Sequence, residues 1–338
     1  MKLQRLHIKN FKSIVDLEIV EPNPFTVFVG PNGSGKSNIF EALEFFSHLS
    51  KSKASQVESL FGGHSFFLNY SLFSKQQLTF EVKYNFEQFA SEAELTFSNN
   101  RIVENFNNIQ TVFDKDKPFK ILGISKQGNY KQFIDEFHRI FIAKHQLLKL
   151  AINDNARLNI AASNLEKVLK RILLDETKRE EIKEWLDLFI PGFENIEIVS
   201  SDLSGTDTLV MYEKGIKKPF TKDLLSDGTY NMLALLAAVY QSDEPQFLCI
   251  EEPENGLTPY VIEQFVELFR NACQEKGHYI WLNTHSPTLV RHLRADELIV
   301  VDKKQGATQI KQFKGKDYFG LRMDEAWLTN ALGGGLPW

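Results

Sequence analysis

The chain has 338 residues, of which 43% are hydrophobic, and a formal net charge of −5, which allows a large core and excludes a surface coated with positive charge for nucleic acid. Its two cysteines are too few for a disulfide framework or a zinc site, and we expect both to pack in the core. No apolar run reaches the roughly 18 residues that span a bilayer. The N-terminal residues alternate like a strand and do not resemble a signal peptide. We therefore expect a soluble cytoplasmic protein that does not itself contact a membrane.

Residues 2–29 predict three strands, of which 25–29 is a short apolar run typical of a strand that is buried on both faces. The glycine-rich loop GPNGSGKSN follows directly at residues 30–38. Apolar residues then recur at helical spacing over residues 36–50. The loop is therefore predicted to join a buried strand to the start of a helix.

The middle of the chain changes character twice. Residues 64–113 contain alternating apolar and polar runs that predict an antiparallel β-meander. Residues 130–190 are mainly helical in pattern, and Ser163 with Glu166 is expected to form a capping box there. A later helix that stops at Pro191 places three apolar residues on one face: Ile182, Leu186 and Phe189.

Residues 226–242 predict an apolar helix, and further apolar strands are expected at 246–250, 278–284 and 296–302. Strands that alternate with helices favour a parallel core sheet, so the predicted fold class is α/β. We expect a single head domain with a core at residues 1–48 and 221–313, the meander at 64–113, a helical insertion at 130–190 and an aromatic tail at 317–338.

The loop at residues 30–38 matches the phosphate-binding pattern G-x-x-x-x-G-K-[ST]. Its glycines let backbone N–H groups turn toward phosphate oxygens, while Lys36 reaches the outer phosphates and the Ser37 hydroxyl binds Mg²⁺. The helix that begins near Lys36 directs its positive end at the same anion. We therefore expect nucleotide contacts from Gly30, Asn32, Gly33, Ser34, Gly35, Lys36, Ser37 and Asn38.

Two acids follow the strand at 246–250, at its carboxyl end, where ligands bind in open α/β sheets. Glu251 is expected to lie near the metal, and Glu252 is expected to polarise the water that attacks the γ-phosphate. Adjacent acids after a strand more often form a solvated turn. The phosphate-binding loop earlier in the chain favours the catalytic interpretation.

Two further groups fit the same chemistry. The strand at 278–284 brings His285 to its carboxyl end, where the ring could donate a hydrogen bond to the γ-phosphate. Ser226 suits the N-cap position of the next helix, and Gly228 permits close backbone approach. A structural loop histidine and simple helix capping are the alternatives.

The segments GPNGSGKS, LSDGT, IEEPENGL and THSP, in that order, resemble the motifs of an ABC-type ATPase head, which is a P-loop NTPase. The opening LHIKNFKSI is similar to the RecF/SMC-like soluble branch, a group that includes AAA-type repair and defence ATPases. The resemblance implies ATP and Mg²⁺ as cofactors, Gly30–Ser37 as Walker A, Glu251 and Glu252 in Walker B, Leu225–Thr229 as the signature, and His285 as the switch histidine.

The resemblance also implies a homodimer that forms head-to-tail around ATP, in which Ser226 and Gly228 of one chain complete the ATP site of the other. It further implies that Lys12 lies near the phosphates and that a glutamine senses the metal. Gln146, after the strand-like RIFIA, is a candidate for that glutamine, with a surface position as the alternative.

Three details depart from the family pattern. The signature reads LSDGT in place of LSGGQ, Glu251 stands where many relatives have aspartate, and ENGL replaces the usual Ser-Ala-Leu-Asp. The last of these departures, in the trans-acting loop, concerns the coupling between the two ATP sites.

The resemblance predicts an ATPase that drives or gates a DNA-directed process, either DNA repair or anti-phage defence. Residues 303–316 hold five lysines and no acid, which fits either a contact with DNA phosphates or a solvated β-hairpin.

The alternative function is a regulatory ATPase that controls a protein effector, such as a nuclease or a toxin, without contacting DNA. Trp327 and Trp338 would then be aromatic anchors for the partner, unless the tail folds onto its own domain. A nucleotide-binding scaffold without turnover is a third class, which the presence of Glu252 and His285 disfavours.

Overall fold

The computed structural model describes residues 2–63, 68, 77–86, 89–97, 101–106, 109–114, 137–140, 157–200, 206–315 and 320–332.

A mainly parallel six-stranded sheet forms the centre of the molecule. Its strand order is β15 (Ala307–Gln312), β14 (Leu298–Lys304), β3 (Phe25–Val29), β13 (Tyr279–Thr284), β12 (Phe247–Glu251) and β8 (Phe137–Ile140). All neighbours are parallel except the β14–β15 hairpin. Every residue of β3, β12 and β13 is buried, which follows from their continuous apolar runs because helices or a second sheet cover both faces. The α/β fold class predicted from the sequence is confirmed.

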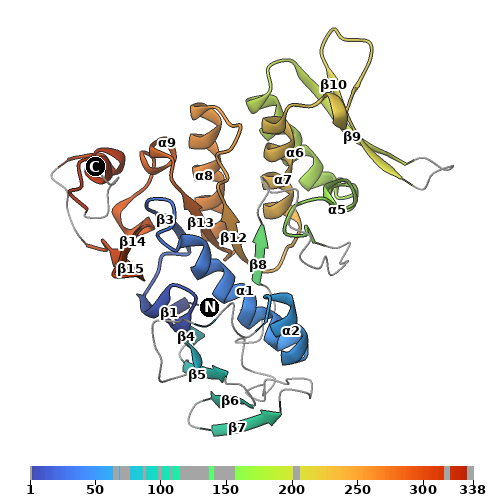
Figure 1. Cartoon of the computed structure of the whole chain (residues 1–338). Helices are drawn as coiled ribbons and strands as arrows, with labels where there is room; N and C mark the ends of the chain where they lie inside the picture. The colour runs from blue at the N-terminus through green and yellow to red at the C-terminus, as the bar shows by residue number, and fades with distance from the viewer. Residues whose placement is uncertain are drawn as a thin grey trace.

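A second sheet of six antiparallel strands packs below the first, with helix α1 (Lys36–Lys51) between them (Figure 1). Its order is β2 (Ile14–Val20), β1 (Lys2–Phe11), β4 (Leu78–Phe86), β5 (Phe89–Phe97), β6 (Arg101–Phe106) and β7 (Ile109–Asp114). The apolar side chains of α1 fill the space between the sheets, where the rings of Phe46 and Phe80 stack with centroids 4.0 Å apart. Helix α2 (Ala54–Leu60) follows α1.

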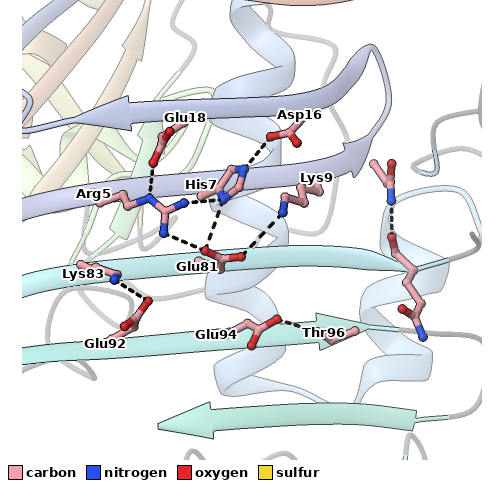
Figure 2. A network of polar contacts seen from close by, with 12 residues as sticks. Arg5, His7, Lys9, Asp16, Glu18, Glu81, Lys83, Glu92, Glu94 and Thr96 are labelled. Atoms are coloured by element: carbon pink, nitrogen blue, oxygen red, sulfur yellow. Dashed lines mark hydrogen bonds and ion pairs between the residues drawn. The ribbon is translucent and has the colours of Figure 1, made fainter. Parts of the chain in front are cut away.

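The outer face of this sheet is charged, with both signs interleaved across the strands (Figure 2). Alternation along β1 puts Leu6 in the core and Arg5 and His7 on the outer face. His7 lies 2.5 Å from Asp16 and 3.2 Å from Glu81, measured between side-chain nitrogen and oxygen. Among the described side chains of β2, β1, β4 and β5, opposite charges therefore face one another.

The other face of the parallel sheet is covered by helices α7 (Asp227–Tyr240) and α8 (Pro259–Glu275), which share a second core (Figure 1). Helices α5 (Leu165–Ile172) and α6 (Glu176–Phe189) join this core. A small sheet of β9 (Phe193–Ser200), β10 (Asp207–Glu213) and β11 (Phe220–Thr221) lies at the opposite end of the molecule from β6 and β7, followed by the 3₁₀ turn η1 (Lys222–Leu224). Short helices α9 (Pro287–Val290), η2 (Ala295–Glu297) and α10 (Met323–Leu328) complete the C-terminal part.

The predicted capping box at Ser163 is wrong. Helix α5 begins at Leu165, and its N-cap residue Asn164 makes no side-chain cap. The preceding turn bonds to itself instead, because the Ser163 amide donates to Asn159 Oδ1 at 2.9 Å. Glu166 pairs with Lys222 at 2.7 Å and so does not reach back to the helix start. The face predicted for the next helix is confirmed, since Ile182, Leu186 and Phe189 are all buried on α6.

Described residues near the C-terminus pack onto the head through Met323, Ala326, Trp327 and Leu332. Trp327 of α10 is fully buried in the core shared with α7 and α8, so the prediction that it is an exposed anchor for a partner is wrong. Trp338 lies outside the described residues. The lysine-rich stretch forms the β14–β15 hairpin, as one of the two sequence interpretations expected. Within the described part of the chain, no helix is both long and apolar enough to cross a membrane.

Candidate active site

Three neighbouring parallel strands end at the same edge of the central sheet and bring the predicted motifs together. Thr284, at the end of β13, is paired with Val29 of β3, and Glu251 of β12 is paired with Asn283 of β13. The loop after β3, the two acids of β12 and the His285 loop after β13 therefore meet at one edge, as expected for a ligand site in an open α/β sheet.

The loop at residues 30–37 wraps around the end of Lys36. The Lys36 ammonium donates to the carbonyl oxygens of Gly30 at 2.7 Å and Pro31 at 3.1 Å. Burial lowers the pKa of Lys36 from its ordinary value, and the nearby carboxylates of Glu252, Glu251 and Glu254 oppose that shift. The site thus holds a buried cation close to several acids.

Glycine is required at position 35, where any side chain would be strained. Its φ is +103°, and a Cβ there would collide with the hydroxyls of Thr308 and Ser13. Those two hydroxyls lie 2.6 Å apart, and Thr308 also donates to the carbonyl oxygen of Ser34 at 3.0 Å. Ser13 and Thr308, 295 residues apart in sequence, therefore support the loop from beneath.

The start of α1 suits an anion. The helix has no acidic residue in its first turn and no side-chain cap, so its first N–H groups face the loop without a competing negative charge. Among the residues that the structure describes, Ser34 Oγ is buried and has no hydrogen-bond partner. These features fit the triphosphate of a nucleotide.

Glu251 and Ser37 are the residues of this edge that could hold a metal ion. The Ser37 hydroxyl donates to Glu251 Oε2 at 2.6 Å, and Asn283 Nδ2 donates to the same oxygen at 3.1 Å. A hydroxyl and a carboxylate fit Mg²⁺, which in phosphate sites takes a few protein oxygens and completes its shell with phosphate and water. The described residues contain no group of three or more His, Cys, Asp or Glu side chains placed to hold a metal ion.

Arg139 of β8 contacts the other oxygen of Glu251, a role that was not predicted from the sequence. Its Nε donates to Glu251 Oε1 at 2.6 Å, and its Nη1 donates to Glu44 of α1 at 2.8 Å. Burial alone would lower the pKa of Arg139, but Glu251 and Glu44 raise it above its ordinary value. The available signal was a basic residue inside the strand-like RIFIA segment.

Glu252 lies just beyond the strand, in a constrained conformation. Its φ is +50°, a value uncommon for a residue other than glycine, and its N–H donates to the carbonyl oxygen of Asn283 at 2.9 Å. Asn255 Nδ2 donates to Glu252 Oε2 at 3.2 Å, and His285 Nδ1 lies 3.8 Å from Glu252 Oε1. The side chains of Glu252 and His285 are 34% and 48% exposed, so both are accessible to a ligand.

A third acid of the same segment supports the His285 loop. Thr284 Oγ1 donates to Glu254 Oε1 and accepts from the Ser286 N–H at 2.9 Å. Burial raises the pKa of Glu254, and the hydrogen bond from Thr284 opposes this rise. Glu254 therefore links the segment after β12 to the segment after β13.

The signature residues lie at the start of α7, next to the segment after β12. Ser226 is the N-cap and accepts from the Thr229 N–H at 3.1 Å. A Cβ on Gly228 would collide with the carbonyl oxygen of Gly256, and Asn231 Nδ2 donates to the carbonyl oxygen of Asn255 at 2.7 Å. Ser226 is exposed, and neither it nor Gly228 bonds the phosphate loop of its own chain within the described residues.

Two predicted residues are not assigned to this arrangement by the described part of the chain. Lys12 pairs with Glu41 on α1, and it is the neighbouring Ser13 that reaches the loop, by accepting from Asn38 Nδ2 at 2.6 Å. Gln146 lies outside the described residues. The roles expected for Lys12 and Gln146 therefore stay predictions.

The whole fold is similar to the head domain of SMC proteins. It aligns with an SMC head bound to the C-winged helix domain of ScpA with a TM-score of 0.62 at 16% identity, covering 96% of this chain and 99% of that one. The SMC head from Thermotoga maritima aligns with a TM-score of 0.56 at 15% identity, over 92% of this chain and 99% of that one. The fold is thus that of an ABC-type P-loop NTPase head.

Sequence comparison gives the family. Residues 25–291 match the family described as "AAA domain, putative AbiEii toxin, Type IV TA system", and the chain belongs to it. An ATP/GTP phosphatase of Helicobacter pylori is 21% identical over 351 residues, which cover 92% of this chain and 91% of that protein.

Relatives named for DNA replication and repair or for chromosome partition match over shorter parts. The DNA replication and repair protein RecF of Lactococcus lactis subsp. cremoris MG1363 is 24% identical over 67% of this chain and 66% of its own length. The Smc protein of Methanocaldococcus jannaschii is 46% identical over 57 residues, which are 17% of this chain and 5% of that protein. Together the fold and the family identify an ATPase of the SMC/RecF-like class.

Proposed function

We propose that ATP binds at the edge where β3, β12 and β13 end, with Lys36 on the outer phosphates and Glu252 as the base that polarises water. The observation that carries this is the hydrogen bond between Ser37 and Glu251, beside the exposed pair of Glu252 and His285. Ser37 and Glu251 would hold Mg²⁺, which supplies positive charge toward the phosphate oxygens when it is bound.

Each side chain then has a separate task. Glu252 accepts the proton of the attacking water through Oε1, which lies 3.8 Å from His285 Nδ1 on a side chain that is 34% exposed. His285 donates a hydrogen bond to the γ-phosphate, and Lys36 neutralises charge that develops on the phosphates. The bond from Asn283 keeps Glu251 turned toward Ser37, which separates the metal carboxylate from the catalytic one.

We further propose that a second copy of the chain completes the site, with its Ser226 and Gly228 facing the γ-phosphate. Support comes from the exposed N-terminus of α7, a helix of 14 residues whose positive end does not bond the phosphate loop of its own chain within the described residues, although Asp227 lies in its first turn. ATP would close the dimer and hydrolysis would reopen it.

Ser226→Arg is expected to abolish ATP-dependent dimerisation, because a long cationic side chain would occupy the space of the partner's phosphates. The measurement is light scattering after size exclusion, with a non-hydrolysable ATP analogue and Mg²⁺. Asp175→Arg changes the N-cap of α6 and serves as the control, since it leaves α7 untouched. A dimer that persists in Ser226→Arg contradicts the shared site.

We propose that the ATP-driven step acts on DNA, in repair or in anti-phage defence. The support is the similarity to RecF, whose name states a role in DNA replication and repair, and the toxin named in the family description. In this chain, the exposed lysines of the β14–β15 hairpin are the local basic surface, although Lys314 is paired with Glu21 at the end of that hairpin.

Changing Lys303, Lys304 and Lys311 together to glutamine is expected to weaken DNA binding and to make its salt dependence less steep. The logarithmic slope should fall by roughly one for each DNA phosphate that the protein no longer binds. The measurement is a fluorescence-anisotropy titration of duplex and single-stranded DNA at several salt concentrations. The matched control changes Lys214, Lys217 and Lys218 of the β10–β11 connection. An unchanged affinity in the hairpin variant removes this surface from the proposal.

The second candidate function is control of a protein effector. The observation that favours it is the likeness to an SMC head that was solved with a domain of a partner protein bound. Absence of any DNA affinity at low salt, together with recovery of a stoichiometric protein partner, would favour this function over the first.

A further inference from the structure

We propose that Arg139 is a positioning residue for the metal side of the site. It holds one oxygen of Glu251, so that the other oxygen stays directed at Ser37 and Mg²⁺. This inference rests on the proposed assignment of Glu251 to the metal.

The two oxygens of Glu251 have separate partners. Oε1 accepts from Arg139 Nε at 2.6 Å and also from Arg139 Nη2, while Oε2 accepts from Ser37 at 2.6 Å and from Asn283 at 3.1 Å. The side chains of Arg139 and Glu251 are only 6% and 2% exposed, so water does not compete for these bonds. The carboxylate is therefore fixed from both sides.

The position of Arg139 in the sheet explains its reach. It pairs in parallel register with Cys249 of β12, two residues before Glu251, and residues two apart on a strand share a face. That face packs on α1, whose Glu44 and Glu41 lie 2.8 and 3.6 Å from Arg139 Nη1. One guanidinium thus connects three elements of the site: β8, β12 and α1.

The length of the Glu251 side chain explains why a second anchor is needed. Glu251 has one more methylene than aspartate and hence more side-chain conformations, so its carboxylate needs a second anchor to keep one geometry. A planar guanidinium suits this task, because its fixed fork donates in a defined direction. Groups that orient a metal ligand in this way typically change metal affinity by about 10- to 100-fold.

The test measures the Mg²⁺ dependence of binding for a fluorescent ATP analogue, together with its affinity in EDTA. For Arg139→Met we expect the Mg²⁺ concentration at half-maximal effect to rise by about tenfold, with the affinity in EDTA changed less than about twofold. Arg139→Lys keeps the charge but removes the fork, and we expect a smaller rise. A merely structural role would not separate these two readouts.

Arg270→Met is the matched control. Arg270 is also buried and also binds a buried carboxylate by two nitrogens, Glu297, but it lies on α8 away from the site. We expect this variant to be less stable without any change in Mg²⁺ requirement. A rise in Mg²⁺ requirement equal to that of Arg139→Met would overturn the proposal.

Glu251→Gln distinguishes failure of the positioning role of Arg139 from failure of the metal assignment of Glu251. If it raises the Mg²⁺ requirement while both Arg139 variants match the unchanged protein, the positioning role is wrong and the metal assignment stands. If Glu251→Gln itself has no effect, the metal assignment fails. Should Arg139→Met not fold, Arg139→Lys decides, and a requirement equal to that of the unchanged protein contradicts the proposal.

Discussion

Glu252→Gln is expected to lower the kcat of ATP hydrolysis by at least about 100-fold and to leave the affinity for ATP nearly unchanged. Glutamine has the same shape as glutamate, but its amide cannot accept a proton from water at neutral pH. The hydrogen bond from Asn255 to Oε2 can persist if the amide oxygen takes that place. Steady-state phosphate release and equilibrium binding of an ATP analogue measure the two quantities.

Glu254→Gln is the control for this prediction. Glu254 lies two residues further along the same segment and bonds Thr284, so its replacement perturbs the loop without removing the proposed base. We expect its kcat to fall by no more than a few-fold. Equal decreases in the two variants, or full turnover in Glu252→Gln, would mean that Glu252 is not the base.

Exposure and hydrogen bonding distinguish the roles of the two adjacent acids. Both oxygens of Glu251 accept hydrogen bonds from side chains, and its side chain is only 2% exposed, so bulk water reaches it less readily than it reaches Glu252. Glu252 is 34% exposed, and its Oε1 faces His285. The positive φ of Glu252 turns the chain at this point and so sends the second side chain away from the direction of the first.

The central fold could be predicted because its signals are local. The runs at 25–29, 247–251 and 279–284 are apolar at nearly every position, which is the pattern of strands that helices or a second sheet cover on both faces. Helix α6 could be predicted from spacing alone, because its buried residues recur at intervals of three and four. The phosphate loop follows from the same strand–loop–helix order.

The supports of the site could not be predicted in this way. Arg139 and Glu251 are 112 residues apart, and only the parallel pairing of β8 with β12 brings them together. The same holds for Ser13 and Thr308, which meet under Gly35 across 295 residues. The pattern at Ser163 misled because the side chain of Asn159 binds both the amide and the hydroxyl of Ser163. Trp327 shows that an aromatic residue near the end of a chain can belong to the core.

Gly228→Ala is expected to destabilise the protein by about 1–3 kcal/mol and to reduce ATP turnover. In an ordinary helix this change would be stabilising by roughly 0.5–1 kcal/mol, because alanine has the higher helix propensity. Here the new methyl group would collide with the carbonyl oxygen of Gly256, a backbone atom that cannot rotate aside. The segment that starts at Glu252 must then shift, which couples the decrease in stability to a decrease in activity. Chemical unfolding and steady-state hydrolysis measure the two effects.

Asp227→Ala is the matched control, since it places the same methyl side chain in the same helical turn at an exposed position. We expect its stability to change by less than about 0.5 kcal/mol, as is usual for surface substitutions. The two outcomes separate close packing from helix propensity, because propensity alone predicts that both variants gain stability. A Gly228→Ala protein that is more stable than the unchanged one would show that the start of α7 and the segment after β12 do not press on one another. Residues 225–229 would then not be linked by direct packing, within one chain, to the segment that carries Glu252, the carboxylate that we assign to catalysis.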